Sequence, residues 1–560
     1  MEATFISLQR TAPLTQIQLT TYPRLCSYIF GLIMLVILLV LTGCQTLPTQ
    51  PHLAKSRYLS QQSRQAGINL THNTDLITHI SRTKNPDPTN LSGYYPLLAS
   101  NDAFASRSIL TSLSQHTIDI QYYIWHNDTA GQLMLKDLYQ AAERGVKVRL
   151  LLDDLATNPA LDQQLLAFAQ HPNVAVRLIN PKVVRNLTPA NFVLALPRYQ
   201  RRMHNKSMTF DHQLSIIGGR NIGDEYLRSD KENEFSDLDV LLAGKVIKPI
   251  QDSFEQYWQS PLSYDIERLV TAAHNPAKNQ TDEPFLQTLD KISTSALDGR
   301  ISKSSQLYQA ASGAVIDQKL LNKRVNFRWV PITFVVDDVT KLQQQDARDS
   351  RLVHQVRRIV GTPKRQFTII SSYFVPTALG VAELTKLAQD GVQINVLTNS
   401  FDATDVPIVH SGYSETRTAL LQSGINLYEL KSTAHPDLRH KKHRLSRSKV
   451  STSLHTKAFA VDDRVAFIGS YNVDPRSANI NTELGVLIFD KQLVQGMHQS
   501  FDDAMLNVSY QVRLDPQGKL QWHTQTPEGT PTQLNKEPKL SWINGLWVKI
   551  FSALPITSLL

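Results

Sequence analysis

Two segments about 250 residues apart carry the same chemically active residue types at the same spacing. The members are His204, Lys206 and Asp211 in the first segment and His455, Lys457 and Asp462 in the second. Each set is followed by a Gly-[Gly/Ser]-x-Asn tetrapeptide, so both segments obey the pattern H-x-K-x4-D-x6-G-[GS]-x-N. A chance match to this pattern is expected on the order of 10⁻⁸ per start position. The repetition therefore indicates a functional element present in two copies.

The residue types in this pattern suit phosphate chemistry. A histidine and a lysine two residues apart share one face of a β-strand, so both can reach one phosphate group. The imidazole is available for attack or proton transfer, and the ammonium for charge neutralisation. Glycines allow the phosphate to approach the backbone, and an asparagine amide can donate to a non-bridging oxygen. The candidate phosphate-binding residues are Gly218, Gly219, Asn221, Gly469, Ser470 and Asn472. The pattern predicts a phosphate site without metal or cofactor.

The elements around both motifs follow an α/β pattern that also repeats. Helix-like sequence over 131–144 precedes strand-like sequence over 146–152. The segment AERGVKVRLLL at 142–152 matches AQDGVQINVL at 388–397, in each case a helix end, a glycine and a β-branched strand. We therefore predict an α/β fold with two similar domains, each a β-sheet flanked by helices. Both histidine motifs are expected to face one shared cleft.

The length of 560 residues suits two packed cores with connecting segments. The expected divisions are a signal peptide at 1–43, a tether at 44–92, a first domain at 93–265, a connecting segment at 266–330, a second domain at 331–510 and a C-terminal extension at 511–560. The connecting segment is rich in Ser, Gln, Asn and Lys and lacks the α/β pattern, which is typical of a connection between domains.

The N-terminal sequence predicts export and lipidation. Its apolar run at 27–41 has 15 residues, fewer than the roughly 20 of a spanning helix. Arg10 and Arg24 precede the run, and Leu-Thr-Gly-Cys44 follows it, which resembles a lipobox with Cys44 as the lipidated residue. The alternative is an uncleaved N-terminal anchor. The only other cysteine, Cys26, would leave with the signal peptide, so disulfides, thiolate catalysis and cysteine–zinc sites are excluded.

The charge balance favours an anionic partner. The net charge is +9, and it becomes +8 without residues 1–43, which hold two Arg and one Glu. Anionic lipid is the favoured partner and nucleic acid the competing one. Near the C-terminus, apolar residues from Trp542 to Leu554 recur at helical spacing. They predict a helix that lies in a membrane interface or, alternatively, packs on the domain.

The paired motifs resemble the HKD motifs of the phospholipase D superfamily, and within it those of the C-type bacterial cardiolipin synthases. Further segments carry the resemblance: QYYIW at 121–125, SDLDV at 236–240, VLTNS at 396–400, ATDV at 403–406, HSGY at 410–413, NTE at 481–483 and LPI at 554–556. The resemblance implies transfer through a phosphohistidine, with His204 as nucleophile and His455 as general acid. It also implies that Asp237 and Glu483 orient the histidines. Asp211 and Asp462 are expected to support the fold by ion pairing.

These observations predict phosphatidyl transfer between phospholipids, as in cardiolipin synthesis, with anionic or zwitterionic phospholipid as substrate and no nucleic acid. Hydrolysis to phosphatidic acid is one alternative, and nuclease activity is a second. A membrane-tethered scaffold that binds phosphate without catalysis is a third, against which the completeness of both motifs argues. The expected location is the bacterial cell envelope, as a membrane-anchored lipoprotein, or the inner membrane through an uncleaved anchor. Water, glycerol and a second phospholipid all remain candidate acceptors.

Overall fold

The computed structural model of the chain divides into two units, Met1–Leu47 and Pro48–Leu560. The residues it describes are 47–49, 51–69, 80, 85–183, 185, 196–228, 233–273, 316, 319–320, 325–344, 346–433, 451–502, 505–526 and 529–538. Every element below belongs to the second unit. The predictions for Cys44, for the apolar run at 27–41 and for the helix from Trp542 to Leu554 lie outside the described residues.

The first half is built on a nine-stranded sheet with the order β10-β1-β8-β6-β5-β2-β3-β4-β9. Its strands are β1 (Ser92–Leu97), β2 (Thr117–Tyr122), β3 (Lys147–Asp153), β4 (Val174–Ile179), β5 (Ser207–Phe210), β6 (Leu214–Gly218), β8 (Asp239–Gly244), β9 (Ser263–Asp265) and β10 (Arg328–Val330). Its helices are α2 (Ala54–Asn69), α4 (Ser100–Leu113), α5 (Thr129–Glu143), α6 (Pro159–Phe168), α8 (Leu196–Tyr199), α9 (Asp224–Leu227), α10 (Ile247–Gln259) and α11 (Ile266–Ala273).

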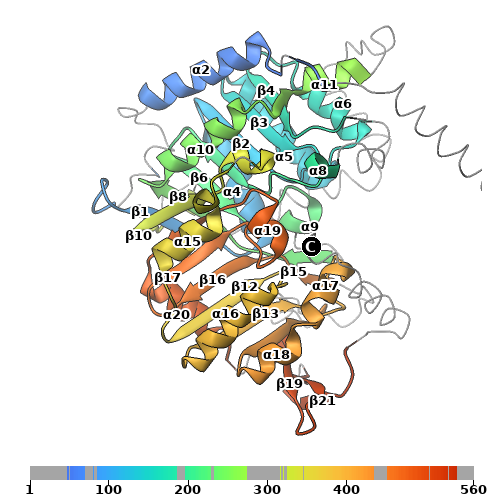
Figure 1. Cartoon of the computed structure of the whole chain (residues 1–560). Coiled ribbons are helices and arrows are strands. Elements are labelled where there is room, and N and C mark those ends of the chain that lie inside the picture. The colour runs from blue at the N-terminus through green and yellow to red at the C-terminus, as the bar shows by residue number, and fades with distance from the viewer. Residues whose placement is uncertain are drawn as a thin grey trace, which may run out of the picture. The chain divides into compact units, whose positions relative to one another are not determined.

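The second half is built on a ten-stranded sheet with the order β11-β18-β17-β16-β12-β13-β14-β19-β20-β21 (Figure 1). Its strands are β11 (Ile332–Val336), β12 (Gln366–Ser371), β13 (Gln393–Asn399), β14 (Asn426–Leu430), β16 (Lys457–Val461), β17 (Val465–Gly469), β18 (Leu484–Ile488), β19 (Ser509–Leu514), β20 (Leu520–Gln525) and β21 (Pro531–Leu534). Its helices are η2 (Val339–Gln343), η3 (Arg348–Ser350), α15 (Leu352–Val360), α16 (Ala378–Gln389), α17 (Pro407–Ser414), α18 (Arg417–Gln422), α19 (Pro475–Asn479), α20 (Lys491–Gln499) and α21 (Met505–Val508).

The two sheets repeat one topology. The order β1-β8-β6-β5-β2-β3-β4-β9 has its counterpart in β11-β18-β17-β16-β12-β13-β14-β19. In both, three consecutive strands joined through helices pair in parallel, β2 with β3 and β4 in the first sheet and β12 with β13 and β14 in the second. Gly145 after α5 and Gly391 after α16 both adopt a left-handed conformation, with φ of 98° and 89°, as the predicted helix terminators require. The predicted duplicated α/β fold is confirmed.

Local sequence explains the central elements. All of β3 except its first residue is buried, which is why its sequence lacks the alternation of a half-exposed strand. Helix α5 begins where the Asp128 side chain accepts from the Gly131 N–H, and Asn158 caps α6 in the same way. These helices cover the sheet and leave the carboxyl ends of the parallel strands free to carry polar residues.

Helix α2 lies within the segment expected to be a tether. It contacts β3 and β4, and its Leu59 joins an apolar cluster with Leu151, Phe254 and Trp258. Among the helices of the described residues, none combines the length and the apolarity needed to cross a bilayer.

The halves meet through a shared apolar core and a small shared sheet. Ile217 and Val240 of the first half belong to the same buried cluster as Ile468 and Val486 of the second. In addition, β7 (Asn233–Ser236) of the first half pairs in parallel with β15 (Ser451–Leu454) of the second. Each of these two strands ends just before a predicted site residue, so the junction of the halves positions the site.

Candidate active site

The two motif histidines are held at the junction by backbone hydrogen bonds between the halves. The His204 N–H donates to the Thr482 carbonyl over 2.9 Å, and the His455 N–H donates to the Ser236 carbonyl over 2.8 Å. Each histidine lies just before a hairpin, β5–β6 or β16–β17. Both are nearly buried, with 8% of His204 and 6% of His455 exposed.

Each histidine is paired with an acid from the opposite half. His204 Nδ1 lies 2.8 Å from Glu483 Oε2, and His455 Nδ1 lies 2.6 Å from Asp237 Oδ2. Because an ionised carboxylate only accepts hydrogen bonds, Nδ1 is the donor in each pair. The Nε2 atom then carries the lone pair of the neutral imidazole, which is the form able to attack phosphorus.

The two motif lysines lie beside their own histidines, as the strand spacing predicts. Lys206 Nζ donates to the His204 carbonyl over 2.7 Å. Lys457 Nζ donates to the His455 carbonyl and, over 3.0 Å, to Ser372 Oγ. Burial lowers the pKa of Lys206 to about 7 and also lowers that of Lys457. An anion bound at the site would favour the charged form of both ammonium groups.

The histidines and lysines form one electrostatic site. Burial lowers the pKa of His204 to about 4, although the Glu483 charge opposes this. Burial also lowers the pKa of His455 well below its usual range, and the charges of Lys457 and Lys206 act in the same direction. Both imidazoles are therefore neutral at pH 7 in the free protein, and each responds to the lysine of the other motif.

The two orienting acids differ in their surroundings. Burial raises the pKa of Asp237. Burial acts the same way on Glu483, but His204, Lys206 and Ser470 outweigh it and lower the pKa of that carboxyl. Glu483 also accepts hydrogen bonds from Ser470 Oγ and, over 2.9 Å, from Ser477 Oγ. Glu483 is thus the more firmly ionised of the two acids.

The motif glycines are packed against the segments that carry these acids. A Cβ added at Gly219 would lie 2.2 Å from Asp237 Oδ1, and one at Gly218 would lie 2.2 Å from Asp239 Oδ1. A Cβ at Gly469 would lie 2.3 Å from the Leu484 carbonyl. The small size predicted to admit phosphate is therefore required by close packing within the protein. Ser470, which stands where the first motif has Gly219, uses its hydroxyl to bind Glu483.

The motif asparagines bind the chain that follows β2 and β12. Asn221 Oδ1 accepts from the Ile124 N–H over 3.2 Å, and Asn472 Oδ1 accepts from Ser372 Oγ over 2.8 Å. Because the oxygen of each amide is used within the protein, its NH₂ group is the part suited to the predicted hydrogen bond with a phosphate oxygen.

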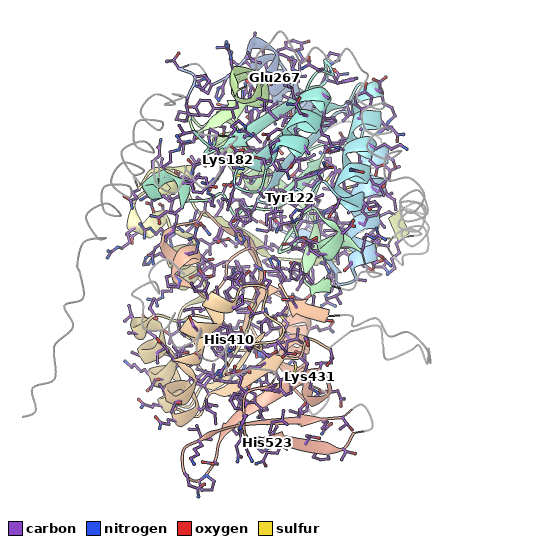
Figure 2. All side chains as sticks on the ribbon, turned by 90° about the vertical axis from the view of Figure 1, so that its right-hand side faces the viewer. Tyr122, Lys182, Glu267, His410, Lys431 and His523 are labelled. Atoms are coloured by element: carbon purple, nitrogen blue, oxygen red, sulfur yellow. The ribbon has the colours of Figure 1, made fainter. Side chains whose placement is uncertain are left out.

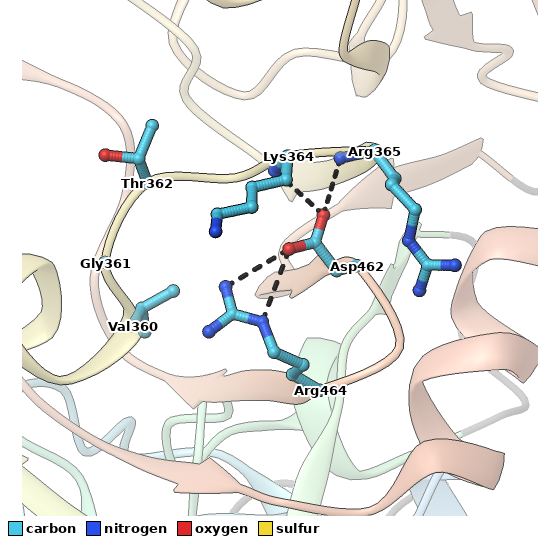
Figure 3. Close-up of a pocket in the computed structure, with 7 residues that line it drawn as sticks. All are labelled: Val360, Gly361, Thr362, Lys364, Arg365, Asp462 and Arg464. Carbon is cyan, nitrogen blue, oxygen red and sulfur yellow. Dashed lines mark hydrogen bonds and ion pairs between the residues drawn. The ribbon is translucent and has the colours of Figure 1, made fainter.

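The motif aspartates lie at the far ends of the hairpins and bind mainly backbone. Asp211 accepts from the N–H groups of Gln115, His116 and Thr117 over 2.8 to 2.9 Å. Asp462 accepts from the N–H groups of Lys364 and Arg365 and pairs with Arg464 at 3.2 Å (Figure 3). It also accepts from the N–H group of Gln366 over 3.2 Å. The sequence predicts ion pairing for both aspartates. Asp462 forms an ion pair with Arg464, whereas Asp211 is held by backbone N–H groups. Asp211 thus anchors the β5–β6 hairpin to the start of β2, and Asp462 anchors the β16–β17 hairpin to the start of β12.

Three aromatic rings that were not predicted surround the histidines. Tyr123 presents its ring to His204 at 4.9 Å between centroids. Tyr226 and Phe235 flank His455 at 5.1 and 5.2 Å. Tyr123 belongs to the QYYIW segment that marked the resemblance, but nothing local in the sequence connects Tyr226 or Phe235 to a histidine 220 or more positions later.

A second unpredicted pair fixes the residue before each histidine. Asp153 Oδ2, at the end of β3, accepts from the Met203 N–H over 2.9 Å. Asn399 Oδ1, at the equivalent end of β13, accepts from the Leu454 N–H over 2.8 Å. A polar residue at the carboxyl end of a buried parallel strand in both halves was the signal that could have identified them. Within the described residues, no group of three or more His, Cys, Asp or Glu side chains is arranged to hold a metal ion.

Comparison with known proteins agrees with this geometry. The family model described as "Cardiolipin synthase, PLD-like domain" matches residues 109–258 and 356–505. Cardiolipin synthase C of Escherichia coli is 37% identical over 468 residues, which cover 84% of this chain and 96% of that protein. Cardiolipin synthase 2 of Staphylococcus epidermidis is 24% identical over 393 residues, 70% of this chain and 64% of that protein.

Among solved structures, phosphatidylserine synthase of Haemophilus influenzae has the same fold. The TM-score is 0.52 at 12% identity, and the likeness covers 89% of this chain and all of the other. The two matched ranges of the family model each contain one histidine motif, one acid and one hairpin. The chain belongs to the cardiolipin synthase family of phospholipase D-like proteins, as its two HKD motifs predicted.

Proposed function

We propose that this protein transfers phosphatidyl groups between phospholipids, as a cardiolipin synthase does, through a phosphohistidine intermediate. The observation that carries the proposal is the crossed pairing of His204 with Glu483 and of His455 with Asp237. This pairing orients two imidazoles at one site and leaves Nε2 of each for the reaction, one as nucleophile and the other to exchange protons, as a two-step displacement needs. Two buried lysines beside them supply positive charge for the phosphate.

The first step forms the covalent intermediate. His204 Nε2 attacks the phosphorus of the donor lipid, a P–N bond forms, and the P–O bond to the headgroup alcohol breaks. His455 gives a proton to the leaving oxygen, which requires it to be protonated in the complex. The bound phosphate anion and the nearby carboxylates favour that form, because an adjacent negative charge raises an imidazole pKa.

The second step reverses the roles. His455, now neutral, takes the proton of the incoming hydroxyl as that oxygen attacks phosphorus, and the P–N bond to His204 breaks. Glu483 stabilises the positively charged phosphohistidine between the steps, through its hydrogen bond to Nδ1. Water in place of the lipid alcohol would yield phosphatidic acid, so exclusion of water decides between transfer and hydrolysis.

The substrates of this reaction place the enzyme at a membrane surface. We propose that the mature chain is anchored there through lipid on Cys44, with the residues around Trp542 lying in the interface. The net positive charge of the chain supports binding to anionic lipid.

The test is mass spectrometry of the products that the full chain forms in vesicles of phosphatidylglycerol. We expect cardiolipin and free glycerol in equal amounts. Phosphatidic acid as the only product would show hydrolysis instead. Cleavage of DNA with no lipid product would show a nuclease, and binding of lipid without any product would show a non-catalytic scaffold. The variant His204→Ala is the negative control for background lipid exchange.

A further inference from the structure

Asp405 lies in the loop between β13 and α17, and this loop begins against the residue that precedes His455. Asn399, the last residue of β13, accepts from the Leu454 N–H over 2.8 Å and donates to the Leu454 carbonyl over 2.9 Å. The start of the loop is therefore fixed to the histidine segment by two hydrogen bonds. The loop continues to Asp405, two residues before α17 begins at Pro407.

Tyr373 joins Asp405 to the catalytic groups. Its hydroxyl donates to Asp405 Oδ2 over 2.8 Å. The adjacent Ser372 accepts from Lys457 Nζ over 3.0 Å and donates to Asn472 over 2.8 Å. Burial lowers the pKa of His455 and of Lys457, and the charge of Asp405 opposes the lowering at both residues. Asp405 therefore stands close enough to the second motif for its charge to act on it.

Asp405 differs from the two orienting acids in being open to solvent. Asp237 and Glu483 are 4% and 0% exposed, whereas Asp405 is exposed. Within the part of the chain that the structure describes, its Oδ1 accepts no hydrogen bond. One oxygen is thus held by Tyr373, and the other is available to a ligand.

The chain that follows β3 in the first half carries a carboxylate of a different kind. Asp154, which follows β3 directly and corresponds to Ser400, is fully buried and pairs with Arg185 at 2.8 Å. Asp154 also accepts a hydrogen bond from the backbone N–H of Lys182 over 2.6 Å. Figure 2 labels Lys182 in the first half. That carboxylate is neutralised and closed off from ligands. Six residues beyond the strand, where the second half has Asp405, the first half has Pro159, so the two halves diverge at this position.

A carboxylate repels a bound phosphate. The presence of Asp405 beside the phosphate site therefore indicates that it binds a different chemical group of the substrate. Ionised carboxylates bind hydroxyl groups well, because both oxygens accept hydrogen bonds. The acceptor alcohol must approach His455, which takes its proton in the second step. We infer that Asp405 binds the non-reacting hydroxyl of the acceptor headgroup and so selects alcohols with two adjacent hydroxyls, such as a glycerol headgroup.

This assignment rests on the proposed transfer and adds acceptor selection to it. In the selected complex, the attacking hydroxyl gives its proton to His455 as the P–O bond forms and the P–N bond breaks. The second hydroxyl keeps its proton and donates it to Asp405. Tyr373 holds the carboxylate in place through the hydrogen bond to Oδ2.

The experiment is a competition between two acceptors for one intermediate. The full chain receives phosphatidyl-p-nitrophenol in mixed micelles with equal concentrations of glycerol and 1-propanol. Mass spectrometry then gives the ratio of phosphatidylglycerol to phosphatidylpropanol, together with phosphatidic acid. Because all three products arise from one intermediate, their ratio does not depend on how quickly the intermediate forms.

We expect the wild type to favour glycerol and Asp405→Asn to lower the ratio about tenfold, the worth of a hydrogen bond to a charged group. Tyr373→Phe should lower it in the same direction by about threefold, since the carboxylate remains but loses one fixing bond. The matched control is Asp252→Asn, which removes a carboxylate that is 55% exposed on α10 and leaves the ratio unchanged.

Three outcomes overturn the inference, and they differ in what they say of the transfer. An unchanged ratio in Asp405→Asn, with phosphatidylglycerol still formed, removes acceptor selection and leaves the transfer intact. Equal loss of all three products at a constant ratio shows that Asp405 acts only on the titration of His455. Phosphatidic acid as the only product of the wild type rejects the proposed transfer, and acceptor selection with it.

Discussion

Replacing Glu483 by glutamine tests the crossed pairing of acid and histidine. Glutamine keeps the shape of the side chain and leaves an oxygen able to accept from His204 Nδ1, but it removes the negative charge. In the free protein that charge opposes the lowering of the His204 pKa by burial. In the proposed intermediate it would face the phosphohistidine cation. The substitution therefore removes a charge that faces His204, Lys206 and two serine hydroxyls, with little change in packing.

The size of the effect follows from the contact itself. The hydrogen bond spans 2.8 Å and the carboxylate is fully buried, so solvent screens it little. A hydrogen bond to a charged group contributes about 1.5 to 3 kcal/mol, against about 0.5 to 1.5 kcal/mol for the neutral bond that glutamine keeps, so the loss is about 1 to 2 kcal/mol. Each 1.36 kcal/mol changes a rate tenfold, so kcat/KM should fall about 5- to 30-fold. The fall should appear in kcat as well, because the intermediate and its transition states carry the positive charge.

The assay is initial-rate production of cardiolipin from phosphatidylglycerol vesicles by the full chain. Ser477→Ala is the matched control, since it removes a 2.9 Å hydrogen bond to the same carboxylate and keeps the charge. We expect a loss of less than about fivefold for this control, in keeping with a single neutral donor. If Glu483→Gln stays within threefold of the wild type, the carboxylate does not support His204 and the crossed pairing has no catalytic role.

Four further predictions concern the roles of the histidines, the pH profile and the two ends of the chain. His455→Ala should accumulate a phosphatidyl adduct on His204 when the donor has a good leaving group, whereas His204→Ala should accumulate none; an adduct on His455 in the latter variant would reverse the roles. Because Lys206 has a pKa of about 7 and acts as a cation, kcat/KM should fall tenfold per unit as pH rises above 7, and a flat profile from pH 6 to 9 would contradict this. Cys44→Ala should leave an unprocessed precursor, and a mature wild-type chain that keeps residues 1–43 without an acyl mass would reject lipidation. Deleting Trp542–Leu560 should reduce turnover of vesicles and spare that of a soluble short-chain phosphodiester; equal loss on both would place the segment in the fold.

The duplicated fold could be predicted because its signals are local. Helix ends, glycine terminators and β-branched strands recur in the same order in both halves, and residues 142–152 and 388–397 carry them most clearly. The HKD spacing likewise places a histidine and a lysine on one strand face without reference to the rest of the chain. These patterns predicted both sheets and the family, and both are confirmed.

The partners of the histidines could not be predicted from local patterns. The pairing of His455 with Asp237 depends on the parallel contact of β7 with β15, strands separated by more than 200 positions. The sequence points to both acids but contains no local pattern that assigns either acid to one histidine. The motif predicts that Gly219 admits phosphate, although the carboxylate of Asp237 occupies the space beside it. Close packing of this kind depends on tertiary contacts that spacing does not reveal.

The crossed pairing also explains why the chain carries two complete motifs. Each half contributes a histidine that lacks its acid and an acid that lacks its histidine, so neither half contains a complete nucleophile. The two centres are nevertheless unequal. Glu483 receives two serine hydroxyls and is firmly ionised, whereas Asp237 packs against a glycine and its pKa is raised by burial. A firmly ionised acid suits the histidine that becomes a phosphorylated cation, and an acid of raised pKa suits a histidine that exchanges protons in both steps. The unequal surroundings of the acids therefore favour His204 as the nucleophile, independently of family resemblance.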